Sequence, residues 1–211
     1  MKTHRFIENF LLLGDHLSVI ARNFSLTKTP LEIIKFDRVE IASNGWHSYP
    51  ELCRLAQVAP LSMSQQDFLA RCKVLHEITK NISTGLLKKL LECAGADKKD
   101  ISQLASLKLL ERLLNIFQSL SKHDEDISAF ENCISQIDWK VKNDGMNFLY
   151  NLNELRKLDA HITGGDPLAI LQSLGFDRAQ TNDGYGLAFD YVFDGIIEEI
   201  SGISESISNV I

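Results

Sequence analysis

The sequence predicts an all-α protein, a multi-helix bundle. In its long stretches, apolar residues recur every three or four positions, which is the spacing of one buried helix face. Capping residues and glycine- or proline-containing stops separate these stretches, and only 4 prolines and 12 glycines are available for turns and loops. We expect at least six helices, with at most a short β-hairpin within residues 31–42, where apolar residues also alternate as in a strand.

The N-terminal part begins with a predicted helix over residues 5–23, whose apolar stripe comprises Phe6, Phe10, Leu13, Leu17 and Ile20. A second helix start follows, because Thr29 is a suitable N-cap, Pro30 suits the first helical position and Glu32 completes a capping box. The segment "SNGWHSYP" at residues 43–50 then breaks the helical pattern.

The C-terminal part has cleaner helix signals. Ser64 and Ser83 each precede an amphipathic run and can act as N-caps. Gly164, Gly165 and Pro167 provide a firm stop for a later run. The predicted helices cover residues 64–81, 83–95, 104–120, 127–139, 146–162, 168–174 and 187–208.

We place a boundary at residue 61. Residues 1–61 are interpreted as an N-terminal helical extension with a loop, and residues 62–211 as the helical bundle. A chain of 211 residues is long enough for one substantial domain with such an extension.

The composition narrows the classes of function. The chain has 22 lysines and arginines against 28 acidic residues, and this net charge of −6 argues against broad binding of nucleic-acid phosphates, although a local basic site remains open. The four cysteines show no CxxC spacing and no metal or phosphate-loop motif occurs, so we expect no cofactor and no metal. No apolar run has the length of a signal peptide core or a membrane span, which favours the reducing cytoplasm.

The predicted helix over residues 146–162 carries the most informative polar residues. Its core face comprises Phe148, Leu152, Leu155, Leu158 and Ile162. Asp159 falls within that face, and Arg156 is at neighbour spacing, so we expect the two side chains to pair. His161 lies about 140° from Arg156 on an ideal helix. The two can therefore converge only if the last turn loosens or if one of them comes from a second copy of the chain.

Arg156 and His161 are the candidate catalytic residues. The negative end of the helix dipole favours the imidazolium form of His161 and should push its pKa upward. Such a histidine can transfer a proton to or from a ribose 2′-hydroxyl or a leaving oxygen, while a fixed arginine stabilises charge on the phosphorane. The pair therefore predicts metal-free cleavage of RNA.

The segment "LNELRKLDAH", with its Arg-x4-His motif on the penultimate major helix, resembles the HEPN superfamily. The hallmark of that family is an arginine followed, four to six residues later, by a histidine. Polar Asn153 and Glu154 before the arginine and the small Ala160 before the histidine add to the similarity. The resemblance implies a bundle that dimerises so that both copies of the motif line one cleft. We assign supporting positions in that cleft to Asn153, Lys157 and Asp159.

Many HEPN members are metal-independent ribonucleases in toxin–antitoxin, CRISPR-linked or antiviral systems. The resemblance implies single-stranded RNA as the substrate, a homodimer, and a cognate antitoxin or defence partner protein, with no DNA and no membrane as partners. Other members have lost catalysis and serve as binding modules. Active members usually carry Asn, Asp or His directly after the arginine, where this chain has Lys157. Lys157 and the acidic charge favour the alternative, a catalytically silent module that binds a partner protein or a nucleotide-type ligand.

A second Arg-x4-His match links Arg71 to His76. It lies in the middle of a predicted helix with no breaker after His76, and its apolar neighbours are Phe68, Cys72, Leu75 and Ile78. We interpret this match as structural, with His76 partly buried or on the flank of the helix.

Overall fold

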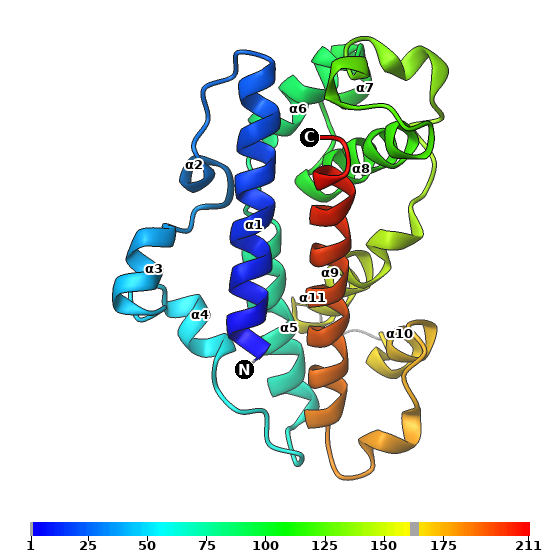
Figure 1. Ribbon diagram of the computed structural model, residues 1–211. Helices are drawn as coiled ribbons and strands as arrows, with labels where there is room; N and C mark the ends of the chain where they lie inside the picture. The colour runs from blue at the N-terminus through cyan, green and yellow to red at the C-terminus, as the bar shows by residue number, and fades with distance from the viewer. Residues whose placement is uncertain (1, 161–164) are drawn as a thin grey trace. The chain divides into compact units, whose positions relative to one another are not determined.

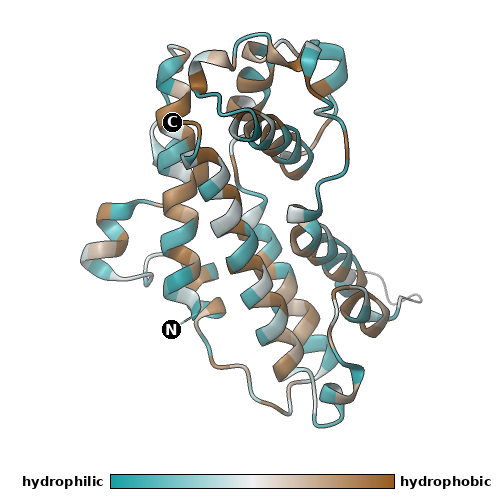
Figure 2. Cartoon of the chain, turned by 45° about the vertical axis from the view of Figure 1, so that its right-hand side comes forward, coloured by the Kyte–Doolittle hydropathy of each residue, from teal (hydrophilic) through white to brown (hydrophobic). Residues whose placement is uncertain are grey.

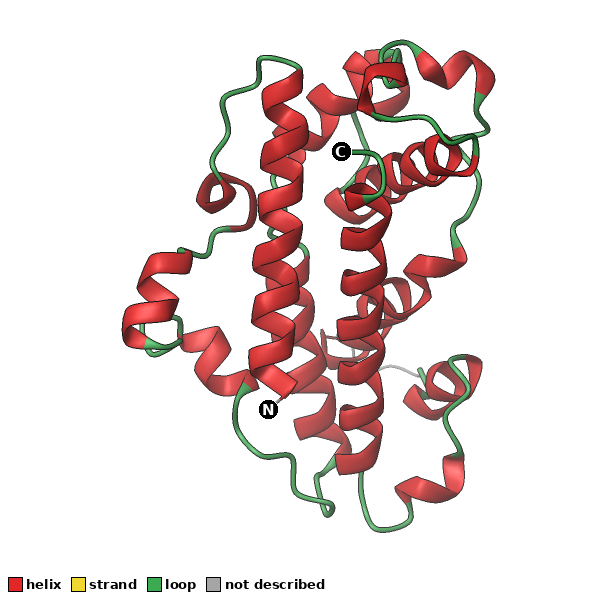
Figure 3. Ribbon diagram, in the orientation of Figure 1, coloured by secondary structure: helices red, strands yellow, loops and turns green. Residues whose placement is uncertain are grey.

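The structure, a computed structural model, describes residues 2–160 and 165–211. Every regular element in these two ranges is a helix, and no strand occurs in them (Figure 3). The predicted all-α class is therefore confirmed. Residues 31–42 contain helical turns in place of the hairpin that the alternating pattern allowed.

The α-helices are labelled in Figure 1. They are α1 (Lys2–Asn23), α2 (Pro30–Ile34), α3 (Arg38–Asn44), α4 (Pro50–Leu55), α5 (Gln65–Thr79), α6 (Thr84–Cys93), α7 (Lys98–Ile101), α8 (Ser106–Lys122), α9 (Asn147–Ala160), α10 (Pro167–Ser173) and α11 (Gly186–Ser208). The described residues also form short 3-10 helices at Ile127–Ala129, Cys133–Gln136, Asp144–Met146 and Arg178–Thr181. None of the described helices has the length and apolar composition needed to cross a membrane.

Local capping signals explain where several helices begin. The Thr29 hydroxyl accepts from the Glu32 amide at 3.3 Å, and Glu32 Oε2 accepts from the Thr29 amide at 3.0 Å, so the predicted capping box is formed. Ser64 accepts from the Asp67 amide at 3.1 Å at the start of α5. Ser83 caps α6 in the same way. These side chains bind backbone N–H groups that have no partner within the helix.

The prediction of a helix over residues 127–139 is wrong. The segment forms two separate 3-10 turns, and Asn132 between them adopts a left-handed conformation with φ of 56°. An α-helix cannot continue through such a residue. The Asp126 side chain also accepts from the Ser128 amide at 2.8 Å, which favours a short turn at the start of the segment.

The described residues group into two compact units that each combine three stretches of chain. Unit 1 draws on the ranges Met1–Ile7, Glu40–Lys80 and Met146–Glu199, and unit 2 on Glu8–Val39, Asn81–Gly145 and Ile200–Ile211. Both units use residues from before and after position 61. The division into an extension over residues 1–61 and a bundle over residues 62–211 stays a prediction.

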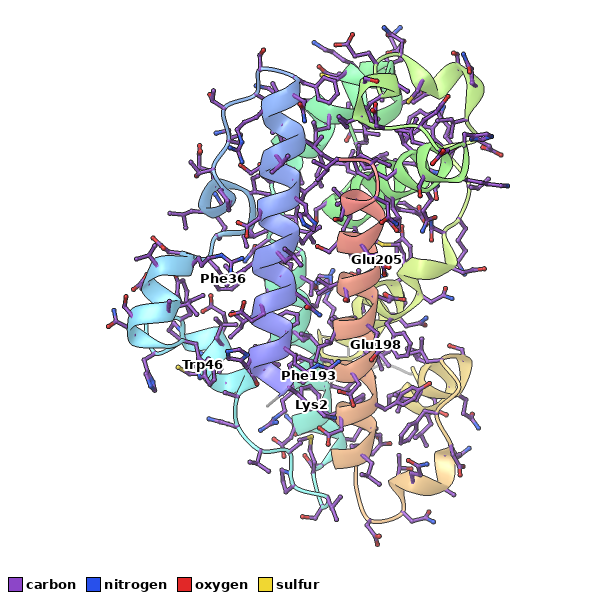
Figure 4. The ribbon with its side chains drawn as sticks, viewed as in Figure 1. Lys2, Phe36, Trp46, Phe193, Glu198 and Glu205 are labelled. Atoms are coloured by element: carbon purple, nitrogen blue, oxygen red, sulfur yellow. The ribbon has the colours of Figure 1, made fainter. Side chains whose placement is uncertain are left out.

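Unit 1 contains the candidate site and is built around the packing of α5 along α9. The start of α1 packs against the first part of α11, where the Phe6 and Phe193 rings meet edge-on with centroids 5.6 Å apart. Lys2 Nζ lies 2.7 Å from Asp194 Oδ2 and 3.3 Å from Asp190 Oδ1. Figure 4 shows Lys2 and Phe193 on these two helices. Aromatic packing and ion pairing therefore hold the start of α1 against the first part of α11.

In unit 2, α8 is strongly amphipathic and packs against α6. Its buried face includes Leu109, Leu110, Leu113, Leu114, Ile116 and Phe117, and Figure 2 shows hydrophobic and hydrophilic residues on different sides of the long helices. Asn115 Nδ2 donates to the carbonyls of Trp139 at 3.1 Å and Val141 at 2.9 Å. Asn143 Nδ2 donates to Asn115 Oδ1 at 2.7 Å. These bonds give buried polar groups the partners that a stable core needs.

The beginning of α11 requires glycine. The Gly186 amide donates to the Leu61 carbonyl at 3.4 Å, and a Cβ added at Gly186 would lie 2.2 Å from the Pro60 carbonyl oxygen. We expect Gly186→Ala to lower the free energy of unfolding by about 1–3 kcal/mol, because the clash is with backbone atoms. Gly202→Ala in the same helix meets nothing within 4 Å and should raise it by up to about 1 kcal/mol. Urea denaturation of both variants tests this, and equal stabilities would contradict it.

Candidate functional site

Cross-helix contacts define how α5 and α9 face each other in unit 1. Lys73 Nζ lies 3.1 Å from Asp159 Oδ2. Three residues further along α5, His76 interacts with Arg156, which lies three residues before Asp159 on α9. The two helices are therefore antiparallel, and each turn of α5 meets an earlier turn of α9.

Arg156 is half-buried at this helix interface. Its Nε donates to Asn153 Oδ1 at 3.2 Å, one turn earlier on α9. Within residues 2–160 and 165–211, no other hydrogen bond and no ion pair is formed by its guanidinium. No described residue therefore binds the two terminal nitrogens.

The expected pair between Arg156 and Asp159 is not formed. Asp159 pairs across the helix interface with Lys73, and its side chain keeps 19% of its surface exposed. The helical wheel correctly indicates that Asp159 lies toward neighbouring helices, but it cannot show which cation on another helix meets it. Arg156 is consequently not needed to neutralise Asp159.

Lys157 and Glu154 lie on the solvent side of the same turn, and Asn153 is half-buried beside them. Lys157 Nζ lies 2.6 Å from Glu154 Oε1, and Asn153 Nδ2 donates to the same carboxylate at 3.2 Å. Both members of the Lys157–Glu154 pair are about half-exposed, so water weakens their attraction. Lys157 therefore points its charge at Glu154 and not at Arg156.

His161, the second candidate catalytic residue, lies outside the described residues, as do Ile162 and Gly164. Its position relative to Arg156 stays a prediction. Before it, α9 extends to Ala160, and after it, α10 begins at Pro167, where the Asp166 side chain accepts from the Leu168 amide at 2.9 Å.

His76, which the sequence suggests is a structural residue, also belongs to this site, because it lies beside Arg156. Its side chain is 4% exposed, and its Nδ1 has no hydrogen-bond partner among the described residues. Burial of the imidazole and the nearby charge of Arg156 lower the pKa of His76 to about 4. Lys80 acts in the same direction, whereas Glu77 and a side-chain hydrogen bond with Asn153 oppose it. The imidazole is therefore neutral at neutral pH.

Arg71, the other member of the second motif match, has a structural role. Its Nη1 donates to the Gln57 carbonyl at 2.8 Å and its Nη2 to the Val58 carbonyl at 3.1 Å. The guanidinium also lies over the Phe189 ring, 5.3 Å from its centroid. Arg71 thus anchors the loop after α4. The structure separates the members of this second match, because His76 faces Arg156 while Arg71 binds the loop after α4.

The N-terminus of α9 is fixed by a carboxylate. Glu199 on α11 accepts from the Phe148 amide at 2.7 Å and from the Leu149 amide at 2.9 Å. Burial nevertheless raises the pKa of Glu199 to about 7, although these backbone hydrogen bonds act in the opposite direction. The helix that carries Arg156 is therefore held at its start by a group that titrates near neutral pH.

A groove of about 660 Å³ borders the site. Its charged lining residues are Glu51 and Arg54 from α4, Asp67, Arg71, Lys73 and Glu77 from α5, and Asp159 from α9. Arg156 does not line the groove, but Asp159 lies one turn further along α9. A ligand bound at Arg156 thus has a groove beside it that is lined by apolar side chains and by charges of both signs.

Comparisons with known proteins identify no family for this chain. No protein-family model matches the chain, and no curated protein or solved structure matches it either. Among the described residues, no group of three or more His, Cys, Asp and Glu side chains is arranged to hold a metal ion.

Proposed function

We propose that this protein is a metal-independent endoribonuclease of the HEPN type, in which Arg156 binds the scissile phosphate. The supporting observation is the state of its guanidinium, which is half-buried, held at Nε by Asn153 and in no ion pair within the described residues. The charge of Arg156 does act on Glu77, but that carboxylate is paired with Lys80. A partly desolvated guanidinium with free terminal N–H groups can bind a phosphate in a bidentate manner, and burial strengthens that attraction.

In this proposal the 2′-hydroxyl oxygen attacks the adjacent phosphorus, and the bond from phosphorus to the 5′ oxygen breaks. The products are a 2′,3′-cyclic phosphate and a 5′-hydroxyl, so no water is consumed. A dimer supplies two copies of His161, of which one accepts the 2′-hydroxyl proton and the other donates a proton to the leaving oxygen. Arg156 stabilises the charge that accumulates on the phosphorane.

The substrate that fits this chemistry is single-stranded RNA, because the attack needs a backbone that can align the 2′ oxygen with the leaving oxygen. Such an activity is harmful to the cell that carries it. We therefore propose a toxin–antitoxin or antiviral defence setting, with a partner protein that restrains or activates the dimer.

A second candidate function is a catalytically silent module that binds a partner protein or a nucleotide-type ligand. It is favoured by the charge around Arg156, because each neighbouring lysine is already paired with a carboxylate. These pairs are Lys73 with Asp159, Lys80 with Glu77, and Lys157 with Glu154. Paired lysines contribute little to holding a long polyanion, so a small ligand with one phosphate fits this environment better.

The two functions are separated by incubating the purified chain with a single-stranded RNA and with DNA of the same sequence, both in excess EDTA. The ribonuclease proposal predicts that the RNA is cut and the DNA stays intact. Cleavage of both, or cleavage of RNA only after a divalent cation is added, would contradict it. Binding of a labelled mononucleotide without cleavage of RNA would support the silent module.

A further inference from the structure

A short polar network lies between α5 and α9 in unit 1. Asn153 is at its centre: its Oδ1 accepts from Arg156 Nε at 3.2 Å, its Nδ2 donates to Glu154 at 3.2 Å, and its side chain bonds His76. The two distances fix which end of the Asn153 amide faces the arginine. His76 is the most deeply buried member of the network, with 4% of its surface exposed.

We propose that neutral His76 is a positioning residue for Arg156, which it orients through Asn153 so that the two terminal guanidinium nitrogens face the ligand. This inference rests on the proposed function, in which Arg156 binds the phosphate. It assigns a role to a histidine that contributes to the site from a different helix and from the other Arg-x4-His match.

The hydrogen-bond pattern around His76 supports this role. Its Nδ1 has no partner among the described residues, so the imidazole reaches Asn153 through Nε2. If Nε2 carries the proton, it donates to Asn153 Oδ1 and leaves Nδ1 as a bare lone pair. That tautomer avoids a buried N–H without an acceptor, which is the costlier arrangement.

The charges that face His76 explain why the neutral form is required. Arg156 lies opposite on α9, Lys80 caps the C-terminal end of α5, and Glu77 is the adjacent acid. A protonated His76 would place a second positive charge beside the guanidinium and would push it away from Asn153. The neutral imidazole orients Arg156 without repelling it.

The Lys73–Asp159 pair provides a matched control for this network. It crosses the same helix interface one turn away, and its side chains make no hydrogen bond with Asn153. Lys73→Met therefore disturbs the packing of α5 on α9 without removing the connection from His76 to Arg156. His76→Gln supplies a neutral amide that can still donate a hydrogen bond, so it serves as the conservative variant.

The test is NMR measurement of the Arg156 Nε–H group in the full chain, with its rate of hydrogen exchange. We expect His76→Ala and Asn153→Ala to accelerate this exchange by a factor of roughly 2–10, the contribution of an ordinary hydrogen bond. Lys73→Met should leave it unchanged, and His76→Gln should restore most of the protection. Unchanged exchange in His76→Ala, or an equal effect of Lys73→Met, would overturn the proposal.

Cleavage of a short single-stranded RNA, measured on the same variants, separates this inference from the proposed function. If the Arg156 signal depends on His76 but RNA is not cut, His76 positions Arg156 for some other anion, and the ribonuclease proposal fails alone. If RNA is cut and His76→Ala leaves the Arg156 signal unchanged, the ribonuclease proposal stands and the positioning role fails.

Discussion

His161→Ala is expected to reduce the rate of RNA cleavage by about 10²–10⁴-fold, because it removes the group that transfers the proton. RNA binding and the fold should be largely retained, since the substitution leaves Arg156 and its hydrogen bond to Asn153 in place. Single-turnover cleavage with an RNA-binding measurement on the same preparation checks both expectations. Cleavage at the rate of the unaltered chain would exclude His161 from the reaction.

Arg156→Ala should have a different effect from His161→Ala, because it removes the phosphate contact. Both RNA binding and cleavage should fall, and Arg156→Lys should not restore them, since an ammonium group cannot present the planar fork of a guanidinium. Because Asp159 pairs with Lys73, the substitution leaves no carboxylate without a partner. We expect the free energy of unfolding to fall by about 1 kcal/mol, the contribution of the lost hydrogen bond to Asn153.

Arg71→Ala is the matched control for these two variants. It removes the hydrogen bonds to the Gln57 and Val58 carbonyls, so it should lower stability while the folded fraction still cuts RNA. If Arg71→Ala abolished cleavage while the Arg156 and His161 variants stayed active, the functional match would be the one at Arg71 and His76.

The stability of the protein is expected to fall as the pH rises through neutrality, because of Glu199. Its pKa is about 7 in the folded chain against an ordinary value of 4.5, so the folded state retains this proton more strongly than the unfolded state. The resulting stabilisation is complete below about pH 4.5 and is lost as the pH rises through about 7. The difference between the folded and the ordinary pKa of Glu199 corresponds to a loss of at most about 3 kcal/mol in the free energy of unfolding.

Urea denaturation at pH 5 and pH 8 measures this effect, with Glu199→Gln as the test variant. The amide carries no charge at either pH, so the difference between the two stabilities should shrink by the amount that Glu199 contributes. Glu198→Gln is the control, because the neighbouring Glu198 side chain is 73% exposed and lies 3.8 Å from the Arg5 guanidinium. A Glu199→Gln variant with the same pH dependence as the unaltered chain would exclude Glu199 as its source.

Features that depend on a few neighbouring residues could be predicted from the sequence. The capping box of Thr29 and Glu32, the N-caps Ser64 and Ser83, and the apolar stripe of α1 are all formed as expected. The helix over 127–139 could not be excluded in this way, because the left-handed conformation of Asn132 is set by the surrounding fold. Local propensity gives way to tertiary structure at such positions.

The candidate site was only partly predictable for the same reason. The sequence identifies Arg156 and shows Asp159 on the inner face of α9, but the partner of Asp159 is Lys73, 86 residues away. His76 lies opposite Arg156 because α5 and α9 pack in an antiparallel register. One sequence signal was available: His76 and Asp159 are polar residues on otherwise apolar helix faces, and such residues usually have a partner on another helix.

The most direct test of the central claim is an analysis of RNA end groups after incubation with the purified chain in EDTA, alongside Arg156→Ala. If Arg156 binds the scissile phosphate while the 2′-hydroxyl attacks, the unaltered chain yields 2′,3′-cyclic phosphate and 5′-hydroxyl ends, and Arg156→Ala yields almost none. Ends that carry a 5′-phosphate, or the same amount of product from Arg156→Ala, would contradict it.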